Sequence, residues 1–237
     1  MIEFLPVIIL VFSFLVLLTV GVPVAWCIAM SSLFTLMVAM PFSAATTTVS
    51  QRIATGLDSF ALLAIPFFIL SGQIMSKGGI ANRLISFAKT LVGFLPGGLA
   101  LINIVSAMLM GAIAGSAMAS ASAMGTILGP EMEKEGYSKE FGAAVNITSS
   151  TTGLVIPPSN TLIVYSLASG GVSIAALFLA GYIPGILTGL LMMIVAMVCA
   201  KKNKYPVGKR SSLKEVFVKF IDALPSLLLL VIVIGGI

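Results

Sequence analysis

An all-α, polytopic membrane protein is the fold class that the sequence predicts, and three observations support it. Of the 237 residues, 59% are hydrophobic and 9% are charged, whereas a soluble domain carries roughly 25% charged residues. The mean hydropathy is +1.16, and apolar runs of membrane-spanning length recur along the chain. The 23 glycines and 11 prolines predict that several helices are interrupted. This composition excludes a soluble enzyme.

Residue types that commonly carry catalysis are scarce in the chain. Histidine is absent, which excludes Ser-His catalysis, histidine-ligated zinc or haem, and histidine proton relays. Cys27 and Cys199 lie in apolar runs without metal-ligand spacing, and we interpret them as buried structural thiols. The net charge of +5 does not indicate nucleic-acid binding, because the basic residues lie in loops between the predicted spans.

The N-terminal part begins with an apolar stretch, 4–40, that contains no charged residue. At about 1.5 Å per residue, a single helix of this length would exceed a hydrocarbon core of about 30 Å. Gly21-Val22-Pro23 interrupts the stretch near its middle, so we expect two spans, 4–20 and 22–40, joined by a tight turn. No Lys or Arg precedes the stretch and no export-type cleavage site follows it, so a cleaved signal peptide is not expected. Residues 41–60 are more polar.

A third span is predicted at 61–76, and a basic amphipathic segment follows at 77–95. In this segment basic and apolar side chains are interspersed, namely Lys77, Ile80, Arg83, Leu84, Ile85, Phe87, Lys89 and Leu91. Such a pattern is typical of helices that lie at the membrane interface. Pro96-Gly97-Gly98 ends the segment.

The distribution of charge predicts how the next segment, 99–130, meets the membrane. The segments 77–97, 131–140 and 201–219 hold three, two and seven of the thirteen Lys and Arg residues. For all three to share one side, 99–130 must enter and leave the membrane there, as a re-entrant hairpin with its tip in the small, polar run 115–122. The positive-inside rule then predicts that these loops are cytoplasmic and that the N-terminus is periplasmic. The mixed charges of 131–140 are interpreted as a solvated loop.

The C-terminal part contains a broken helix, a return span and a basic loop. Residues 141–168 are largely apolar, but Pro157-Pro158 removes two backbone donors. A span is predicted at 172–200, a basic loop follows at 201–219, and a further apolar run reaches the end of the given sequence. We interpret the basic loop as a topology anchor that contacts anionic lipids.

A coupling cation would have to be bound by neutral oxygens. No Asp or Glu lies at the centre of a predicted span, where a proton-coupled carrier usually needs one. Neutral oxygens gather at the tip, 115–122, and in the run 146–161 around the double proline. A broken helix exposes carbonyls that suit Na⁺, and amides at the next N-terminus that suit a carboxylate. The alternative explanations are close packing of small residues and hydroxyls that bond back to their own helix.

Four segments together resemble the large membrane subunit of the tripartite ATP-independent periplasmic (TRAP) transporters. They are LAIPFFILSG at 63–72, FLPGGLA at 94–100, GAIAGSA at 111–117 and GLVIPPS at 153–159. The resemblance runs over nearly the whole chain, and the order and spacing of the segments make it specific. It implies an elevator-type secondary transporter of the bacterial inner membrane. Such a subunit has two inverted repeats, each with a re-entrant hairpin and a broken helix.

The resemblance also implies a domain organisation and partners. The chain resembles the N-terminal half of such a subunit, and a second repeat is expected beyond Ile237. Residues 1–98 would form scaffold, 99–168 half of the transport domain, and 169–237 the return span, the basic loop and the start of a further span. Na⁺ would drive import of a small organic acid that a soluble periplasmic binding protein delivers. A small membrane subunit would also be required.

By similarity, a sodium site lies between the hairpin tip and the break. The matching residues are Gly115 and Ser116 at the tip, and Gly153, Ile156 and Pro158 at the break. Substrate binding is assigned to nearby hydroxyls and an amide, namely Ser120, Ser149, Ser150, Thr151, Ser159 and Asn160. Within the resemblance, the hydroxyl-rich run 149–152 and Asn160 favour sialic acid over C4-dicarboxylates.

Two other functions stay open at this point. An elevator carrier without a binding protein, such as a sodium–dicarboxylate symporter, would show uptake that is independent of an added binding protein. A non-transporting membrane scaffold or assembly subunit would bind no Na⁺ and pass no solute. An enzyme is not expected, because without histidine or a carboxylate at membrane depth the chain lacks most plausible general bases.

Overall fold

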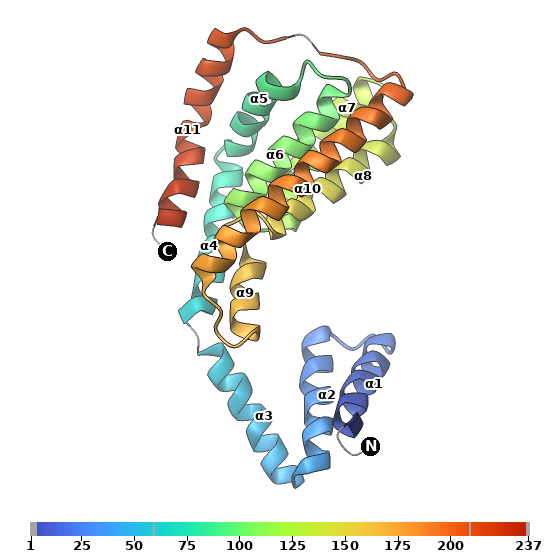
Figure 1. Cartoon of the computed structure of the whole chain (residues 1–237), viewed down its shortest axis with the longest axis vertical. Helices are drawn as coiled ribbons and strands as arrows, with labels where there is room; N and C mark the ends of the chain where they lie inside the picture. The colour runs from blue at the N-terminus through green and yellow to red at the C-terminus, as the bar shows by residue number, and fades with distance from the viewer. Residues whose placement is uncertain (1–3, 59, 209, 236–237) are drawn as a thin grey trace. The chain divides into compact units, whose positions relative to one another are not determined.

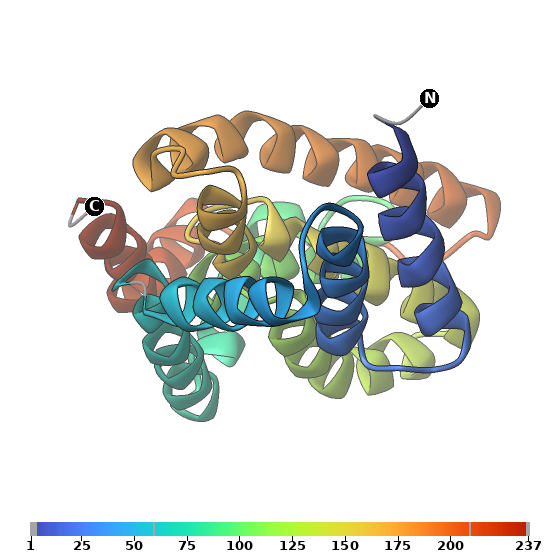
Figure 2. The ribbon, with the colours of Figure 1, turned by 90° about the horizontal axis from the view of Figure 1, so that it is seen from below.

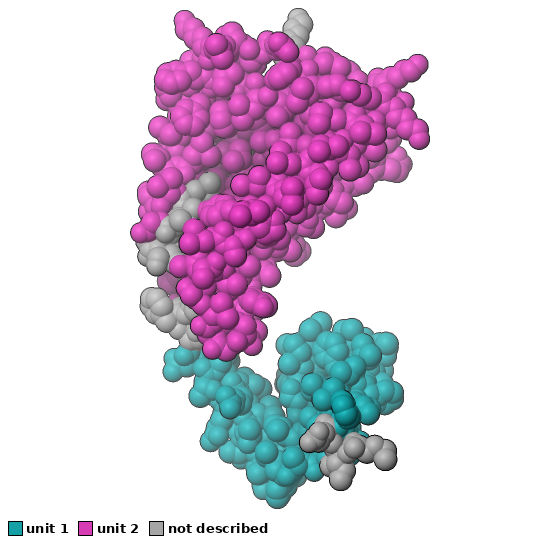
Figure 3. Space-filling model, viewed as in Figure 1, with its two compact units in different colours: residues 1–60 teal, residues 61–237 magenta. Residues whose placement is uncertain are grey.

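The computed structural model describes residues 4–58, 60–208 and 210–235, which are helical apart from short connections. An all-α fold is thereby confirmed for these residues, whereas the elevator mechanism and the inverted repeat stay predictions. The chain forms two compact units, residues 1–60 and residues 61–237 (Figure 3). Lys209, one of the seven basic residues in 201–219, lies outside the described residues, as does Glu3.

The first unit consists of α1 (Leu5–Thr19), α2 (Val24–Ala39) and α3 (Phe42–Leu57). The connection at 20–23 confirms the predicted turn between two apolar helices. The helix α3 occupies the polar stretch 41–60, for which the sequence predicted no element. Threonine hydroxyls along α3 donate to carbonyls four residues earlier, so these hydroxyls find their partners within the helix itself.

The second unit is built around the hairpin of α6 (Gly98–Ala114) and α7 (Ala117–Lys134). Nearly all of α6 is buried, because α5, α7, α8, η2, α10 and α11 all contact it (Figure 1). These two helices form a hairpin whose turn is only Gly115-Ser116, and its re-entry into the membrane stays a prediction. The rest of the polar run, 117–122, is the start of α7, which corrects the predicted tip. The helix α7 also takes up the first part of the predicted loop 131–140.

The broken helix is confirmed as α8 (Lys139–Ser150), the 3₁₀ turn η2 (Thr151–Leu154) and α9 (Asn160–Ala168). The predicted return span is α10 (Ile174–Lys202), which runs along one side of the second unit (Figure 2). Among the described residues, α10 alone is long and apolar enough to cross a membrane by length and composition. The apolar helices α1, α2 and α6 are shorter.

Three further helices complete the second unit, namely α4 (Phe60–Lys77), α5 (Ile80–Val92) and α11 (Leu213–Gly235). The helix α4 coincides with the predicted third span. The apolar side of α5, including Leu84 and Ala88, is buried, and α6 and α11 contact this helix. We expected α5 to rest on the membrane interface through its apolar side, and the structure covers that side with protein instead. Because α10 extends to Lys202 and α11 begins at Leu213, the basic loop is shorter than the predicted 201–219. Asp222 lies inside α11.

The Pro96-Gly97-Gly98 motif joins α5 to α6 beneath the end of α10. Gly97 has a φ of +75°, a conformation that glycine adopts without steric cost. A Cβ atom on Gly97 would collide with the side chain of Ala200, and Pro96 forms an isolated β-bridge with Val207. The motif therefore does more than end a helix, because it allows the start of α6 and the end of α10 to approach closely.

Candidate functional site

The tip of the hairpin is shaped by one glycine and one serine. Gly115 ends α6 with a φ of +59°, and its N–H donates to the Gly111 carbonyl at 2.8 Å. Ser116 is the N-cap residue of α7, and its Oγ accepts a hydrogen bond from the Ala119 N–H at 3.4 Å. A left-handed residue followed by a helix cap reverses the chain within two residues.

The hairpin tip packs against the break between α8 and α9. The Asn160 N–H donates to the Gly115 carbonyl at 3.4 Å. A Cβ atom on Gly115 would lie 3.1 Å from the Pro158 carbonyl oxygen and 3.6 Å from Asn160 Cγ. The structure thus brings Gly115 and Pro158, two residues of the predicted sodium site, together with Asn160, which was assigned to substrate binding. Their roles as ligands stay predictions.

One turn below the tip, two glycines bring backbone against backbone. A Cβ atom on Gly111 would lie 2.5 Å from Gly153 Cα, and one on Gly153 would lie 2.8 Å from Gly111 Cα. Both residues are buried. No side chain fits between α6 and η2 at this crossing, so the positions of the tip and the break depend directly on each other.

The other side of the break is covered by small residues of α10. A Cβ atom on Gly181 would lie 2.5 Å from the Val155 carbonyl oxygen, and one on Gly185 would collide with the Ile156 side chain. Ile156 and Pro158 are buried. The sequence reasoning missed Gly181 and Gly185, although their spacing of four residues on one apolar helix is a signal for close helix packing.

The hydroxyls that were assigned to the substrate mostly bond back to their own helix. The Ser150 Oγ donates to the Asn146 carbonyl at 2.7 Å, and the Thr151 Oγ1 donates to the Thr148 carbonyl at 2.6 Å. Ser149 Oγ approaches both the Asn146 carbonyl at 3.2 Å and Asn103 Oδ1 at 3.3 Å. The sequence analysis offered hydrogen bonds to the same helix as an alternative role for these hydroxyls, and these are the bonds that the Ser150 and Thr151 hydroxyls donate. The hydroxyl oxygens keep lone pairs that can still face a cation.

Ser120 and Ser159 are used to hold neighbouring segments. The buried Ser120 Oγ donates to the Ala107 carbonyl at 3.1 Å and so ties α7 to α6. Ser159 stands at the N-cap position of α9, where a serine side chain commonly caps the helix. Its side chain makes no cap bond, and its Oγ instead donates to the Leu154 carbonyl at 2.7 Å. This bond satisfies one of the carbonyls that the break leaves without a helical partner.

Asn160 offers a free acceptor at the contact between tip and break. Its Oδ1 is buried and has no hydrogen-bond partner among the described residues. A buried polar atom normally has a partner in the protein, in water or in a ligand. This atom lies on a residue that contacts the Gly115 turn, so it is the strongest side-chain candidate for a bound cation or a substrate donor.

Asn103 and Asn146, which both lie within hydrogen-bond distance of the Ser149 hydroxyl, are two polar residues that the sequence assignment did not include. The Asn146 Nδ2 donates to the Ala121 carbonyl at 2.9 Å, while its Oδ1 lacks a partner among the described residues. Asn103 is 1% exposed. An asparagine inside each of two apolar segments is a signal that could have pointed to them.

The groups that meet at the tip and the break are all neutral. They are backbone carbonyls, hydroxyls and the Asn160 amide, without an ionisable side chain. A site of neutral oxygens on broken helices suits a monovalent cation, whereas divalent ions are usually held with carboxylates. The arrangement is therefore chemically suited to bind Na⁺ and to present amide donors to an anion.

Comparison with known proteins gives a family and several relatives. The family described as "Tripartite ATP-independent periplasmic transporter, DctM component" matches residues 11–237. The uncharacterized protein YgiK of Salmonella typhimurium is 56% identical over 232 residues, which cover 98% of this chain and 53% of that protein.

Two further relatives carry functional names. The C4-dicarboxylate TRAP transporter large permease protein DctM of Pseudomonas aeruginosa is 42% identical, covering 76% of this chain and 42% of that protein. The sialic acid TRAP transporter large permease protein SiaM of Vibrio cholerae is 37% identical, covering 96% of this chain and 52% of that protein. The chain spans about half the length of the curated relatives it matches.

Proposed function

Because the chain belongs to the DctM family of tripartite ATP-independent periplasmic transporter components, we propose that the full-length protein is the large permease of a sodium-coupled importer. Its cargo is a small organic acid together with Na⁺. The protein is placed in the bacterial inner membrane, with a periplasmic N-terminus and cytoplasmic basic loops. The observation that carries the proposal is the contact of the hairpin tip with the helix break, which gathers neutral oxygens around Gly115 and Asn160.

In this proposal Na⁺ is held by the tip and the break together. The candidate ligands are oxygens of Gly115, Ser116, Gly153, Ile156 and Pro158, with Asn160 Oδ1 as an additional acceptor. Because Gly111 and Gly153 touch backbone to backbone, a cation that draws the break inward also shifts the tip. Cation binding would in this way preorganise the substrate site.

The substrate is bound beside this cation. An organic acid carries a carboxylate, which the N–H groups at the start of α9 are oriented to receive. Sialic acid is the first substrate to test, and a C4-dicarboxylate is the second. The hydroxyl-rich run 149–152 supports sialic acid less than its composition suggests, because most of these hydroxyls donate to their own helix.

The protein is proposed to work with a small membrane subunit and a soluble periplasmic binding protein. The test is uptake of radiolabelled acid into proteoliposomes that hold the full-length permease and the small subunit. Purified binding protein is added outside, and an inward Na⁺ gradient is compared with an inward proton gradient. Uptake that needs both Na⁺ and the binding protein is the expected result.

Other outcomes of the uptake experiment separate the alternatives. Na⁺-driven uptake that does not need the binding protein would indicate a simple sodium–dicarboxylate symporter. Transport of the C4-dicarboxylate alone would keep the mechanism and replace the substrate. Folded protein that transports neither acid under either gradient would contradict the proposal and favour a scaffold subunit.

A further inference from the structure

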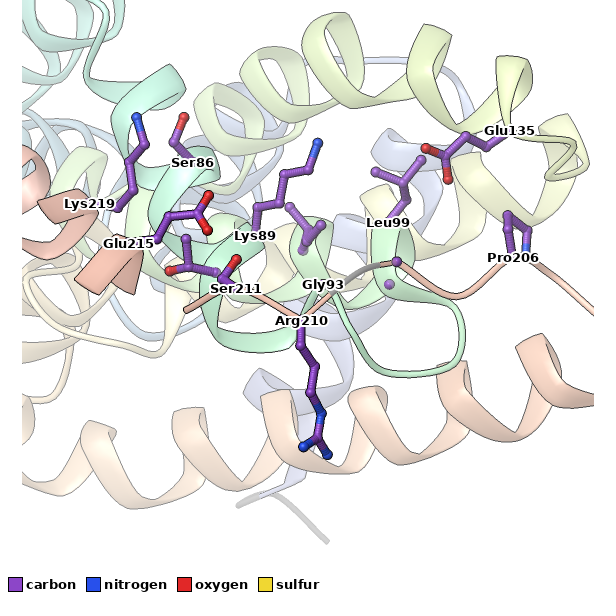
Figure 4. A pocket seen from close by; sticks show the side chains of 14 residues that line it. Ser86, Lys89, Gly93, Leu99, Glu135, Pro206, Arg210, Ser211, Glu215 and Lys219 are labelled. Carbon is purple, nitrogen blue, oxygen red and sulfur yellow. The ribbon is translucent and has the colours of Figure 1, made fainter. Parts of the chain in front are cut away.

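Two pockets of the second unit lie apart from the hairpin tip. The larger, of about 660 Å³, is lined by residues of α5, α6 and α11. Figure 4 shows two lysines and two glutamates around it, namely Lys89, Lys219, Glu135 and Glu215. These opposite charges offset one another, so the lining favours a ligand of neither sign. The smaller pocket, of about 210 Å³, lies between α6, α7 and α8, and Asn146 is part of its wall.

Asn146 connects α8 to the hairpin close to the proposed cation site. Its side-chain Nδ2 donates to the Ala121 carbonyl at 2.9 Å, and Ala121 lies in the first turns of α7, just after the Ser116 cap. The backbone carbonyl of Asn146 accepts the Ser150 hydroxyl at 2.7 Å, and Ser150 is the last residue of α8 before η2. One residue therefore joins the strand of contacts that leads to the tip with the one that leads to the break.

Two further side-chain contacts complete the connection among the three helices. The Ser120 Oγ donates to the Ala107 carbonyl at 3.1 Å and joins α7 to α6. The Ser149 Oγ lies 3.3 Å from Asn103 Oδ1 and joins α8 to α6. Together with the Asn146 bond, they link each pair among α6, α7 and α8 through a side chain. Ser120, Ser149 and Asn103 are at most 1% exposed, so water does not compete for these contacts.

The position of the Asn146 amide depends on Gly125 in α7. A Cβ atom on Gly125 would lie 2.8 Å from Asn146 Nδ2, which is too close for two unbonded atoms. An alanine there would push the amide away from the Ala121 carbonyl. The pocket beside the amide gives the displaced side chain room. Gly129, one turn further along α7, lines the same pocket, but a Cβ atom on it would meet nothing within 4 Å.

We propose that Asn146 is a positioning residue for the cation site, which sets the affinity for Na⁺ by fixing the hairpin to α8. The proposal rests on the proposed function, because it concerns the Na⁺ site between the tip and the break. When the amide leaves the Ala121 carbonyl, the start of α7 can tilt away from α8. The Gly115 turn then loses its fixed position against Asn160, and Na⁺ has to order oxygens that were ordered beforehand.

The test measures the thermal unfolding midpoint of the purified full-length protein in detergent against NaCl concentration, with KCl added to keep the ionic strength constant. The variant Gly125→Ala keeps every polar group of the protein and displaces only the Asn146 amide. It should need about fivefold more Na⁺ than the parent for half of the full rise in midpoint, the order expected for the loss of one hydrogen bond. Because alanine favours a helix more than glycine does, the variant is expected to fold.

The matched control is Gly129→Ala, the same substitution in the same helix and the same pocket wall, and it should show the Na⁺ dependence of the parent. A second variant, Asn146→Ala, removes the amide itself and should also need more Na⁺. Combining Asn146→Ala with Gly125→Ala should add nothing further, because both changes act on one hydrogen bond.

Several outcomes would overturn the proposal. They are an unchanged Na⁺ dependence in Gly125→Ala, an equal shift in the Gly129→Ala control, and additive shifts in the double variant. A lower midpoint with the Na⁺ dependence of the parent would give Asn146 a role in stability alone and would likewise overturn it. A parent protein that does not respond to Na⁺ would contradict the proposed cation site itself, whereas a responsive parent with unshifted variants would contradict this inference alone.

Discussion

Gly111 and Gly153 are the residues that let the hairpin and the break touch. Because a Cβ on Gly111 would meet the backbone of Gly153, Gly111→Ala cannot be relieved by a side-chain rotation. Overpacking of this kind typically costs about 1–3 kcal/mol. We expect Gly111→Ala to lower the thermal unfolding midpoint of the full-length protein in detergent and to reduce uptake.

The matched control for this substitution is Gly142→Ala in α8. A Cβ there would make only ordinary contacts at 3.8 Å with the Met132 side chain, and alanine favours a helix over glycine by about 1 kcal/mol. This variant should be as stable as the parent or more stable. An equal loss of stability in both variants would show that the crossing of α6 and η2 has no special role.

Tyr137 gives the fold a dependence on alkaline pH. Its ring stacks on Tyr205 with centroids 4.2 Å apart, and burial raises the pKa of Tyr137 to about 12. The folded protein therefore binds the phenol proton more tightly than the unfolded chain does. This stability is fully present below about pH 10, the usual tyrosine value, and is lost as the pH rises towards 12.

The substitution Tyr137→Phe keeps the stacked ring and removes the titrating group. It should match the parent near neutral pH and unfold at a higher temperature than the parent between pH 10 and 12. The measurement is the unfolding midpoint against pH for both proteins. Parallel curves over this range would contradict the assignment.

At the residue scale, the sequence predicted the identities of the polar residues better than their contacts. The tip residues Gly115 and Ser116 and the break around Pro158 could be found from composition, because glycine, serine and proline are unusual in the middle of apolar segments. The directions of the hydroxyls could not be found. The hydroxyls of Ser150 and Ser159 each have several possible carbonyl acceptors in the sequence, and the packing of the backbone determines which carbonyl lies within hydrogen-bond distance.

At the element scale, α5 and α11 form a pair whose stability depends on packing more than on charge. The Phe87 and Phe220 rings lie 5.7 Å apart, and aromatic pairs add about 0.5–1.5 kcal/mol to the effect of burial. The Arg83–Asp222 contact is about half exposed at 4.0 Å, and such surface pairs contribute about 0–1 kcal/mol. Phe220→Ala should therefore lower the unfolding midpoint more than Asp222→Asn. The reverse order would mean that charge holds the pair.

Most helices could be predicted from apolar length and from glycine and proline punctuation. The predicted spans coincide with α1, α2, α4 and α10, and the broken helix with α8 to α9. The helix α3 was missed because its sequence is polar, and the sequence does not show that the threonine hydroxyls donate to carbonyls of the same helix. The exact tip was missed because 117–122 is polar yet helical, and the covering of α5 could not be foreseen because its partner α11 lies over 100 residues away.

At the scale of the whole molecule, the second unit holds the hairpin of α6 and α7 in contact with the broken helix of α8, η2 and α9. This chain spans about half the length of its curated relatives, so the proposed uptake has to be tested on the full-length protein with its proposed partners. The part described here supplies the proposed cation site, on α6, η2 and the start of α9. Cation binding is therefore the property on which the proposed transport depends most.

The most direct measurement is the thermal unfolding midpoint of the full-length protein in NaCl and in KCl at equal ionic strength. A ligand that binds only the folded state stabilises it by about 2.7 kcal/mol at one hundred times its dissociation constant. We predict a rise of the midpoint with Na⁺ and not with K⁺, and a need for more Na⁺ in Asn160→Ala. A parent protein whose midpoint is the same in both salts would contradict the proposed sodium site.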